Sequence, residues 1–535
     1  MAFLRIEQKK SGRYIRIVES YKKDGVPRHR TKYSLGKVED YHPQQLERIA
    51  KKLLELAGCR LEDIIKDDLK EIRRTNYGYA LVIKSLWKQL GLDVWMKKIN
   101  YKRRIRFNWL SALELMLAER LNDPCSKRSS YFHQSDYSGF SESKIDLQHL
   151  YRTLDLLSEE QESLKKHLFT TQQSLFSSCL DVVFYDVTTL YFDSQREDEN
   201  SLAQKGYNKD GKHHKIQIVL GLLIDKLRNP ITYHVYRGNR YEGKTMIDAL
   251  EDLQKKYKID KVIVVADSAM IDKENREFIE KQGNIDYIIG ERLKNLPSKV
   301  SQYLINPEKH QRIYDKEGSV FTYSKIEYQN RKIICTYSPK RAMKDRSERE
   351  KLIKKAKELL ENSSKLSQIK KRGAARYIRQ ESEGKHLLDI EKIKSDEKWD
   401  GYKAISTTTD LSVNEVLEKY GDLFEVEHAF RTLKSQLEIR PIFHWTNKRI
   451  EGHIAMCFIG YTMLNYIRLK SGLQIEEIVR TIDKMQLSEI QESQTKETFF
   501  LRSSIDANQQ KIIQTLKLVV PKDVTSHKAI YQYYK

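Results

Sequence analysis

The stretch from residue 181 to residue 290 constrains the fold more than any other part of the chain. It begins with three runs of apolar and β-branched residues, at 181–192, 214–225 and 230–237, and turn-forming segments separate these runs. Helical and strand patterns then alternate up to residue 290. A meander of three strands followed by alternating helices and strands predicts a mixed β-sheet with helices packed on its faces.

The patterns on either side of this stretch predict further parts. Residues 3–36 alternate apolar and polar positions around a Lys-Asp-Gly turn, which predicts a small antiparallel sheet. Residues 44–178 show helical periodicity, and the basic residues between two of these helices suit a DNA-binding region as well as a solvated helical face. Strand character returns at 401–410, and helical patterns follow at about 412–438 and 449–469.

The charge of the chain indicates a polyanionic partner. Lys and Arg outnumber Asp and Glu by 22, and nucleic acid is the commonest partner of such a protein, although a solvated basic surface would give the same count. Half of this surplus, a net charge of +11, lies in residues 293–400, which combine a hairpin-like pair of strands with a charged helical run. Within this segment we expect Lys370, Lys371 and Arg372 to contact DNA phosphates.

The sequence also argues against a membrane or secreted protein. No run of 18 apolar residues occurs, so no segment is expected to span a membrane. The first residues lack the apolar core of a signal peptide, and the five cysteines show no pair with zinc-finger spacing. We therefore expect a cytoplasmic protein with reduced thiols.

Two aspartates are the first candidates for a metal site. Asp186 lies inside the first strand of the mixed sheet, where both faces are apolar or β-branched, so we expect it to be central and buried. A carboxylate there is costly unless a cation or hydrogen bonds compensate. Asp267 ends a run of five apolar residues, and ligands of open α/β sheets bind at the carboxyl ends of strands. Either aspartate could be purely structural, but two adjacent carboxylates would repel each other without a divalent cation such as Mg²⁺ or Mn²⁺.

The helix predicted at 412–438 supplies a third acid. At 100° per residue, one polar stripe contains Tyr420, Glu427, Arg431 and Lys434. Leu423 falls at the edge of the neighbouring apolar stripe, and Glu425 points away from it, so the geometry selects Glu427. A charged stripe on a helix is usually only a solvated face, and it is the two aspartates that favour a functional interpretation.

Other conspicuous residues carry less weight. His213 and His214 suit a loop surface better than a metal site, and His428 lies off the polar stripe. Trp399 could stack on an unpaired base, but a packed hydrophobic anchor is the more common role.

The three acids on this strand order resemble the acidic triad of the RNase H-like fold. The chain also resembles the DDE transposases of bacterial insertion sequences, in the insertion-sequence-four group. The motifs that carry the likeness are YDVTT at Asp186, ADSAM at Asp267 and YGDLFEVEHAFRTLK around Glu427. The later stretch RPIFHWTNKRIEGHI resembles the branch named for insertion sequence sixteen-thirty-four.

One position departs from the pattern of that group, which carries a Y-x2-R-x3-E-x6-K signature. Tyr420, Glu427 and Lys434 match it, but Leu423 stands where the signature has Arg. A phosphate contact expected at that point would have to come from another residue, for example Arg431.

The resemblance implies a fold and an activity. The fold would be multidomain and mixed α/β, with an RNase H-like core interrupted by a β-containing basic insertion and preceded by a helical DNA-binding region. The protein would bind terminal inverted repeats, cleave DNA at the element ends and transfer the 3′ ends to target DNA, as a homodimer or larger synaptic complex at the bacterial nucleoid. The three acids would hold two Mg²⁺ or Mn²⁺ ions, while Tyr420, Arg431 and Lys434 would lie along the bound DNA.

We accordingly divide the chain into six segments: an N-terminal β-hairpin region (1–43), a helical DNA-binding region (44–178), the first part of the core (179–292), the basic insertion (293–400), the second part of the core (401–470) and a helical tail (471–535). Two alternatives to a transposase stay open. One is a metal-dependent nuclease of the same fold without strand transfer. The other is a non-catalytic DNA-binding descendant, against which the intact triad argues.

Overall fold

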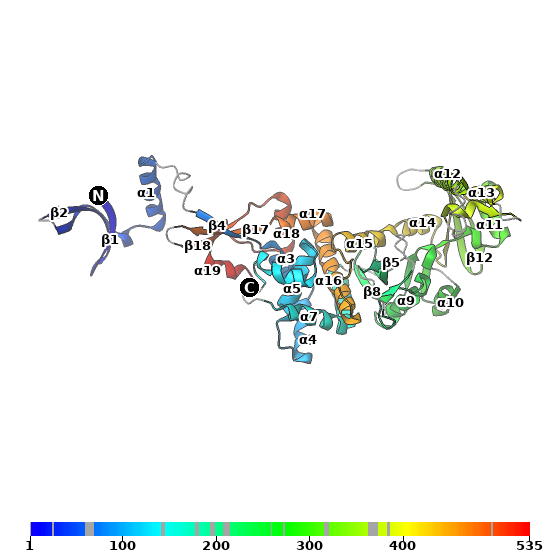
Figure 1. Cartoon of the computed structure of the whole chain (residues 1–535), viewed down its shortest axis with the longest axis horizontal. Coiled ribbons are helices and arrows are strands. Elements are labelled where there is room, and N and C mark those ends of the chain that lie inside the picture. The colour runs from blue at the N-terminus through cyan, green and yellow to red at the C-terminus, as the bar shows by residue number, and fades with distance from the viewer. Residues whose placement is uncertain are drawn as a thin grey trace. The chain divides into compact units, whose positions relative to one another are not determined.

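The computed structural model describes most of the chain (Figure 1). The described residues are 2–23, 26–58, 69–140, 145–176, 181–192, 198–206, 215–257, 259, 261–270, 273–314, 320–361, 373–381, 386–493 and 496–534. Lys370, Lys371, Arg372, His213 and His214 lie outside them. The chain forms two compact units, of which the first comprises Met1–Arg74, Ser488–Leu501 and Val524–Lys528 and the second comprises the rest.

The first unit contains the three-stranded antiparallel sheet that the alternating pattern predicts. Its N-terminal elements are β1 (Ala2–Lys9), β2 (Gly12–Lys23), β3 (Val26–Lys37) and α1 (Pro43–Leu56). β2 is the central strand of the sheet. α1 begins at Pro43, whose fixed φ and missing N–H suit the first turn of a helix, and the His42 side chain accepts a hydrogen bond from the amide of Gln44.

The C-terminal segment, which was expected to be helical, also contains three strands. These strands are β17 (Gln486–Glu492), β18 (Thr498–Arg502) and β19 (Val524–Ser526). Together with β4 (Leu69–Asn76) they form a sheet in the order β19-β18-β17-β4. The expectation of a purely helical tail is wrong because β17 pairs with a strand near the other end of the sequence, and a local pattern does not reveal such a partner.

The helical part of the second unit is packed around one long apolar helix. Its main elements are α3 (Gly78–Gln89), α4 (Leu92–Arg103), α5 (Trp109–Asn122), α7 (Leu147–Glu159) and α16 (Asn447–Ser471). α16 contacts both α5 and α7, and α5 and α16 are buried over most of their lengths. A Cβ atom at Gly452 would lie 2.0 Å from the carbonyl oxygen of Leu154, so glycine is what lets α7 approach α16 so closely. The apolar faces of the predicted DNA-binding region therefore form core, and its contact with DNA stays a prediction.

Even α16, the longest of these helices, is no candidate membrane span. No helix in the described part of the chain is both long enough and apolar enough to cross a bilayer.

The mixed sheet of the second unit follows the predicted order of elements. Its first five long strands are β5 (Val182–Tyr191), β7 (Ile216–Asp225), β8 (Pro230–Arg237), β9 (Val262–Ala266) and β10 (Ile285–Glu291). They lie in the order β8-β7-β5-β9-β10, with β5, β7 and β8 antiparallel and β5, β9 and β10 parallel. The intervening helices α9 (Met246–Lys255) and α10 (Lys273–Gln282) help to bury a shared apolar core with β5 and β9.

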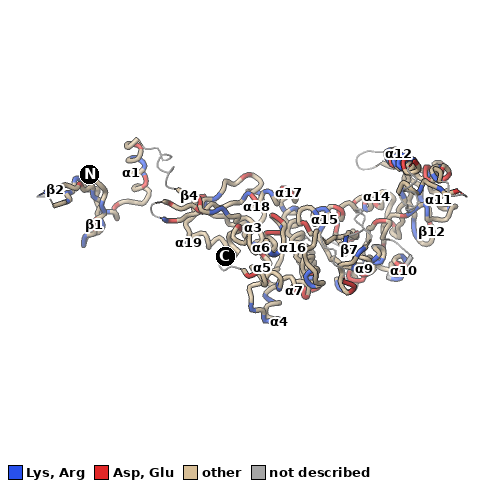
Figure 2. The backbone as a smooth tube through the Cα atoms, viewed as in Figure 1, with Lys and Arg blue, Asp and Glu red and all other residues tan. Residues whose placement is uncertain are grey.

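The basic insertion extends this sheet. Its strands β11 (Gln311–Tyr314), β12 (Val320–Tyr328) and β13 (Arg331–Tyr337) join β10 through β16 (Tyr402–Thr407), in the order β11-β12-β13-β16-β10. Its helices are α11 (Ser298–Ile305), α12 (Pro339–Glu361) and α13 (Ile390–Glu397). Figure 2 shows that α12 carries both basic and acidic residues. Because β13 pairs with β16 and β16 pairs with β10, the strands of the insertion are hydrogen-bonded into the mixed sheet.

The single helix predicted at 412–438 is two helices. α14 (Val413–Gly421) ends before Asp422, and α15 (Phe424–Ser435) begins after Leu423. The amide of Leu423 bonds back to the carbonyl of Tyr420, which tightens the chain at this point. An angular count that starts at Tyr420 therefore does not carry over into α15.

Candidate active site

The first two acids lie side by side on neighbouring strands. In the parallel pair of β5 and β9, Tyr185 is aligned with Ala266, so Asp186 and Asp267 are the next residues along the two strands. Such strands are about 4.8 Å apart. β5 is a central strand, as predicted, but Asp186 is half-buried because its partner strand ends at this level, and Asp267 is exposed.

Glu427 comes from α15, which packs against β5. Its side chain is exposed, whereas Glu425 is ion-paired with Arg228. Burial lowers the pKa of Lys403 in β16, while Asp267 and Glu427 both act to raise it. Glu425 is thus committed to a structural ion pair, and Glu427 is the acid of this helix that shares a cationic neighbour with Asp267.

The carboxylates of the three acids are not gathered into a closed ligand cage. Within the residues that the structure describes, only Glu119, Cys125 and His133 bring three ligand atoms within 4.8 Å of one another. The three acids therefore lie farther apart than this. Their donor set consists of carboxylate oxygens alone, which suits hard divalent cations such as Mg²⁺ and Mn²⁺.

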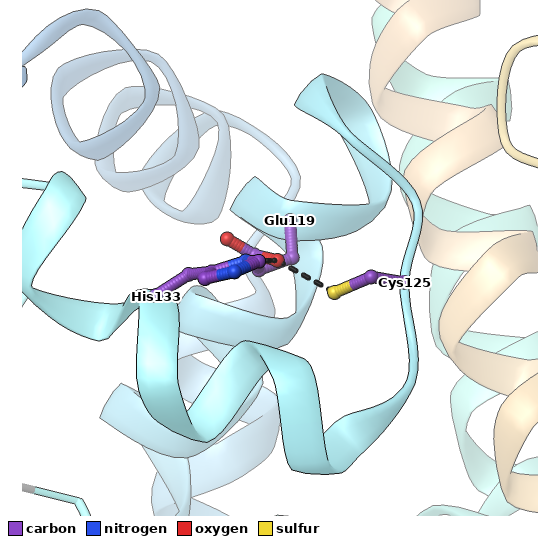
Figure 3. A group of neighbouring side chains, drawn as sticks. All are labelled: Glu119, Cys125 and His133. Carbon is purple, nitrogen blue, oxygen red and sulfur yellow. Dashed lines mark hydrogen bonds and ion pairs between the residues drawn. The ribbon is translucent and has the colours of Figure 1, made fainter.

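Figure 3 shows the cluster of Glu119, Cys125 and His133, which joins α5 to α6 (Lys127–His133). The Cys125 thiol donates to Glu119 Oε2 at 2.7 Å, and His133 Nδ1 lies 3.5 Å from the same oxygen. Burial and Arg120 lower the pKa of the neighbouring Lys127 to about 7. Because Glu119 Oε2 is already in contact with both the Cys125 thiol and the His133 imidazole, we assign the cluster to the packing of α5 against α6.

The other members of the predicted stripe lie in different environments. Tyr420 is buried at the end of α14, whereas Arg431 is exposed and Lys434 half-buried on α15. Leu423, which was expected at the edge of the apolar stripe, is half-buried at the interruption between the helices. Glu427, Arg431 and Lys434 therefore share one face of α15, whereas Tyr420 belongs to a separate helix.

A pocket of about 420 Å³ opens beside Asp267, and the sequence did not single out its basic residues, which are Arg292, Lys294, Arg341 and Lys403. The Lys403 amine lies 4.3 Å from the ring centre of Tyr420. Trp399 also lines the pocket, and it packs against the apolar cluster of the insertion, in agreement with its interpretation as an anchor. The one available signal for Lys403 was that it is the single charged residue in 402–407.

The hydroxyl of Tyr420 closes one side of this pocket. A Cβ atom at Gly290 would lie 2.6 Å from that hydroxyl and 3.0 Å from the amide nitrogen of Ser268. Burial, followed by the charge of Asp267, raises the pKa of Tyr420, so the phenol is neutral at physiological pH. Gly290 is therefore needed for its small size, because any side chain would displace the tyrosine.

Comparisons with known proteins place the chain in a family. The transposase DDE domain matches residues 177–463, and the IS1634 family transposase N-terminal domain matches residues 4–59. No curated protein matches the chain.

Two solved structures show a distant likeness. The Mos1 transposase paired-end complex with left transposon end is 13% identical, with a TM-score of 0.15, and the match covers 34% of this chain and 59% of that one. The pre-cleavage Mos1 transpososome is 14% identical, with a TM-score of 0.15, and the match covers 34% of this chain and 60% of that one. The chain thus spans less than two thirds of the length of either.

The match to the DDE domain extends over more than half of the chain and contains Asp186, Asp267 and Glu427. The chain belongs to the DDE transposases of insertion sequences.

Proposed function

We propose that this protein binds the terminal inverted repeats of an insertion sequence, cuts the DNA at the element ends and transfers the 3′ ends to target DNA. The observation that carries the proposal is the alignment of Asp186 with Asp267 on neighbouring parallel strands, with Glu427 on a helix packed against the same strand. The strand order β8-β7-β5-β9-β10 supports an RNase H-like core around these residues.

The donor set fits two divalent cations, Mg²⁺ or Mn²⁺, held by Asp186, Asp267 and Glu427. When bound, such ions activate a water or a 3′-hydroxyl and stabilise the leaving 3′ oxygen. The protein's own part is to hold the carboxylates. Asp186 and Asp267 are fixed by strand register, and Glu427 is fixed by the packing of α15 on β5. Exposure of Asp267 and Glu427 leaves the site accessible to a DNA strand.

Positive charge outside the acidic site supports binding of the DNA backbone. Residues 1–37 contain eleven Lys and Arg but three Asp and Glu, and β3 is exposed over most of its length. Strands can enter DNA grooves, so this sheet is a candidate surface for the element ends. The basic insertion is the second such surface, and Arg431 and Lys434 lie along the helix that carries Glu427. A homodimer or larger complex would bring two ends together.

The test uses purified protein, DNA carrying the ends of its own element and Mg²⁺, with nicked and joined products resolved on a gel. The expected result is both products. Glu427→Gln should abolish them, while the matched variant Glu425→Gln should lower stability by breaking the Arg228 pair and still cut DNA. Nicking without joining would favour a nuclease, and no metal-dependent nicking would contradict any catalytic role.

A further inference from the structure

We propose that the pocket beside Asp267 binds a backbone phosphate of the DNA strand being cut, and that Lys403 and Arg341 supply the positive charge that Leu423 does not. The inference rests on the proposed transposase function and deepens it. It assigns a phosphate site to residues that come from the insertion and from the strand that follows it.

The position of Lys403 is the first observation. It lies on β16, next to β10, and its amine stands over the ring of Tyr420 at 4.3 Å. Leu423 follows Tyr420 by one tight turn, and its amide is bonded to the Tyr420 carbonyl. The Lys403 ammonium therefore lies beside Tyr420, near the end of α14 where the chain turns into α15. Both residues line the pocket.

The pairing of the pocket's charged residues is the second observation. Lys294 is ion-paired with Asp396 at 2.6 Å, and Glu291 is held by Arg276 at 2.8 Å. In the described part of the chain, no carboxylate lies within 4.0 Å of the Lys403 amine, although Asp267 and Glu427 are close enough to influence it. A half-buried ammonium without a paired anion favours binding of an anion.

Arg341 adds a second cation at the mouth of the pocket. Its guanidinium lies 3.7 Å from Asp345 and remains about half exposed, with 47% of the side chain accessible. Its charge also acts on Tyr420 and Lys403. Arg presents a planar set of donors and Lys a compact charge, and both bind phosphate oxygens well.

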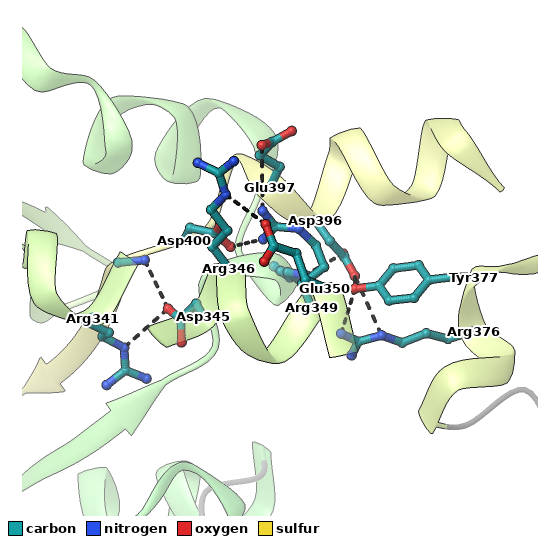
Figure 4. Close-up of polar contacts among 12 residues, drawn as sticks. Arg341, Asp345, Arg346, Arg349, Glu350, Arg376, Tyr377, Asp396, Glu397 and Asp400 are labelled. Carbon is teal, nitrogen blue, oxygen red and sulfur yellow. Dashed lines mark hydrogen bonds and ion pairs between the residues drawn. The ribbon is translucent and has the colours of Figure 1, made fainter. Parts of the chain in front are cut away.

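A network of ion pairs and hydrogen bonds connects the start of α12, which carries Arg341, to the residues just before β16, which carries Lys403 (Figure 4). Asp345 binds Arg341 and accepts a hydrogen bond from the amide of Gly401 at 3.0 Å. Arg349 of α12 pairs with Asp400, immediately before Gly401. The start of α12 and the entry into β16 are thus tied together, which keeps Arg341 and Lys403 at one rim of the pocket. The insertion then has a defined part in catalysis, because it positions a phosphate next to the acids.

The test measures binding and does not depend on turnover. Duplexes carrying an element end, each with one neutral methylphosphonate at a successive linkage around the cut, are titrated against the protein in Ca²⁺. Wild-type protein should lose about tenfold in affinity at one linkage near the cut, because that change removes a charged contact. Lys403→Ala should bind the unmodified end about 10- to 100-fold more weakly and should be insensitive to that linkage. Lys403→Arg should stay sensitive.

The matched control is Lys281→Ala, which removes an exposed lysine from α10 in the first part of the core, outside both the pocket and the basic insertion. It should keep the wild-type pattern, and thermal unfolding establishes that each variant is folded. If the wild-type protein cuts and joins the ends but Lys403→Ala keeps the wild-type pattern, the phosphate site is wrong while the transposase function stands. If the wild-type protein neither binds nor cuts the ends, both are wrong.

Discussion

Replacing Gly290 by alanine would place a methyl group against the hydroxyl of Tyr420. The added Cβ atom would lie 2.6 Å from that oxygen, 3.0 Å from the amide nitrogen of Ser268 and 3.2 Å from the Ser268 Cβ. The backbone amide has little freedom, because Ser268 begins the 3-10 helix Ser268–Met270, two residues beyond the end of β9. The tyrosine must therefore move by about 0.8 Å to restore an ordinary contact, and such overpacking costs about 1–3 kcal/mol.

The displacement should be visible in activity as well as in stability. Tyr420 lies under the Lys403 amine and beside Asp267, so a shift of this size moves groups that flank the proposed cleavage site. We expect Gly290→Ala to lower the free energy of unfolding by about 1–3 kcal/mol in urea denaturation. We also expect the rate of strand cleavage to fall by about tenfold or more, since misplacements near 1 Å can cost about 100-fold.

Two further variants isolate the cause. Tyr420→Phe removes the clashing oxygen, so the double variant Gly290→Ala/Tyr420→Phe should regain a large part of both losses. Gly421→Ala is the matched control, because a Cβ atom there meets nothing within 4 Å and alanine favours the helix. A Gly290→Ala protein as stable and active as wild type, or a double variant no better than the single one, would refute the assigned position of Tyr420.

Four further predictions follow from the site and its surroundings. Asp186→Asn, Asp267→Asn and Glu427→Gln should each abolish cleavage and spare DNA binding in a gel-shift assay; since the three act together, a double variant much slower than the singles would contradict the assignment. Replacing Lys370, Lys371 and Arg372 by Gln should flatten the dependence of DNA affinity on salt, and an unchanged slope would mean that these charges are only solvated. Leu423→Arg should lower the melting temperature because a half-buried position would receive a charge. An unchanged melting temperature would argue against the placement of Leu423 between α14 and α15. Burial holds the pKa of Lys127 near 7, far below that of a lysine in an unfolded chain, and among the described residues its amine has no hydrogen-bond partner. The unfolded chain therefore binds more protons above pH 7, so stability should rise with pH from 7 towards 10, and Lys127→Met should remove that rise and stabilise the protein at pH 7.

Local pattern was enough for the elements that bear the three acids. The apolar run around Asp186 predicted a central strand because a strand flanked on both sides needs two apolar faces. The run before Asp267 predicted a strand end, and helical periodicity separated Glu427 from Glu425, which the structure places in an ion pair with Arg228. These properties depend on residues within a few positions of each other, so the sequence alone determined them.

Only the tertiary structure decided which distant segments meet. β16 inserts between β10 and β13, which brings Lys403 to the pocket beside Asp267, and β17 pairs with β4 across nearly the whole chain. The interruption at Leu423 moved Tyr420 onto a helix of its own, although the periodicity of 412–438 is continuous. Strand pairing and helix breaks of this kind are set by the burial of surfaces far apart in the sequence, and local periodicity carries no information about them.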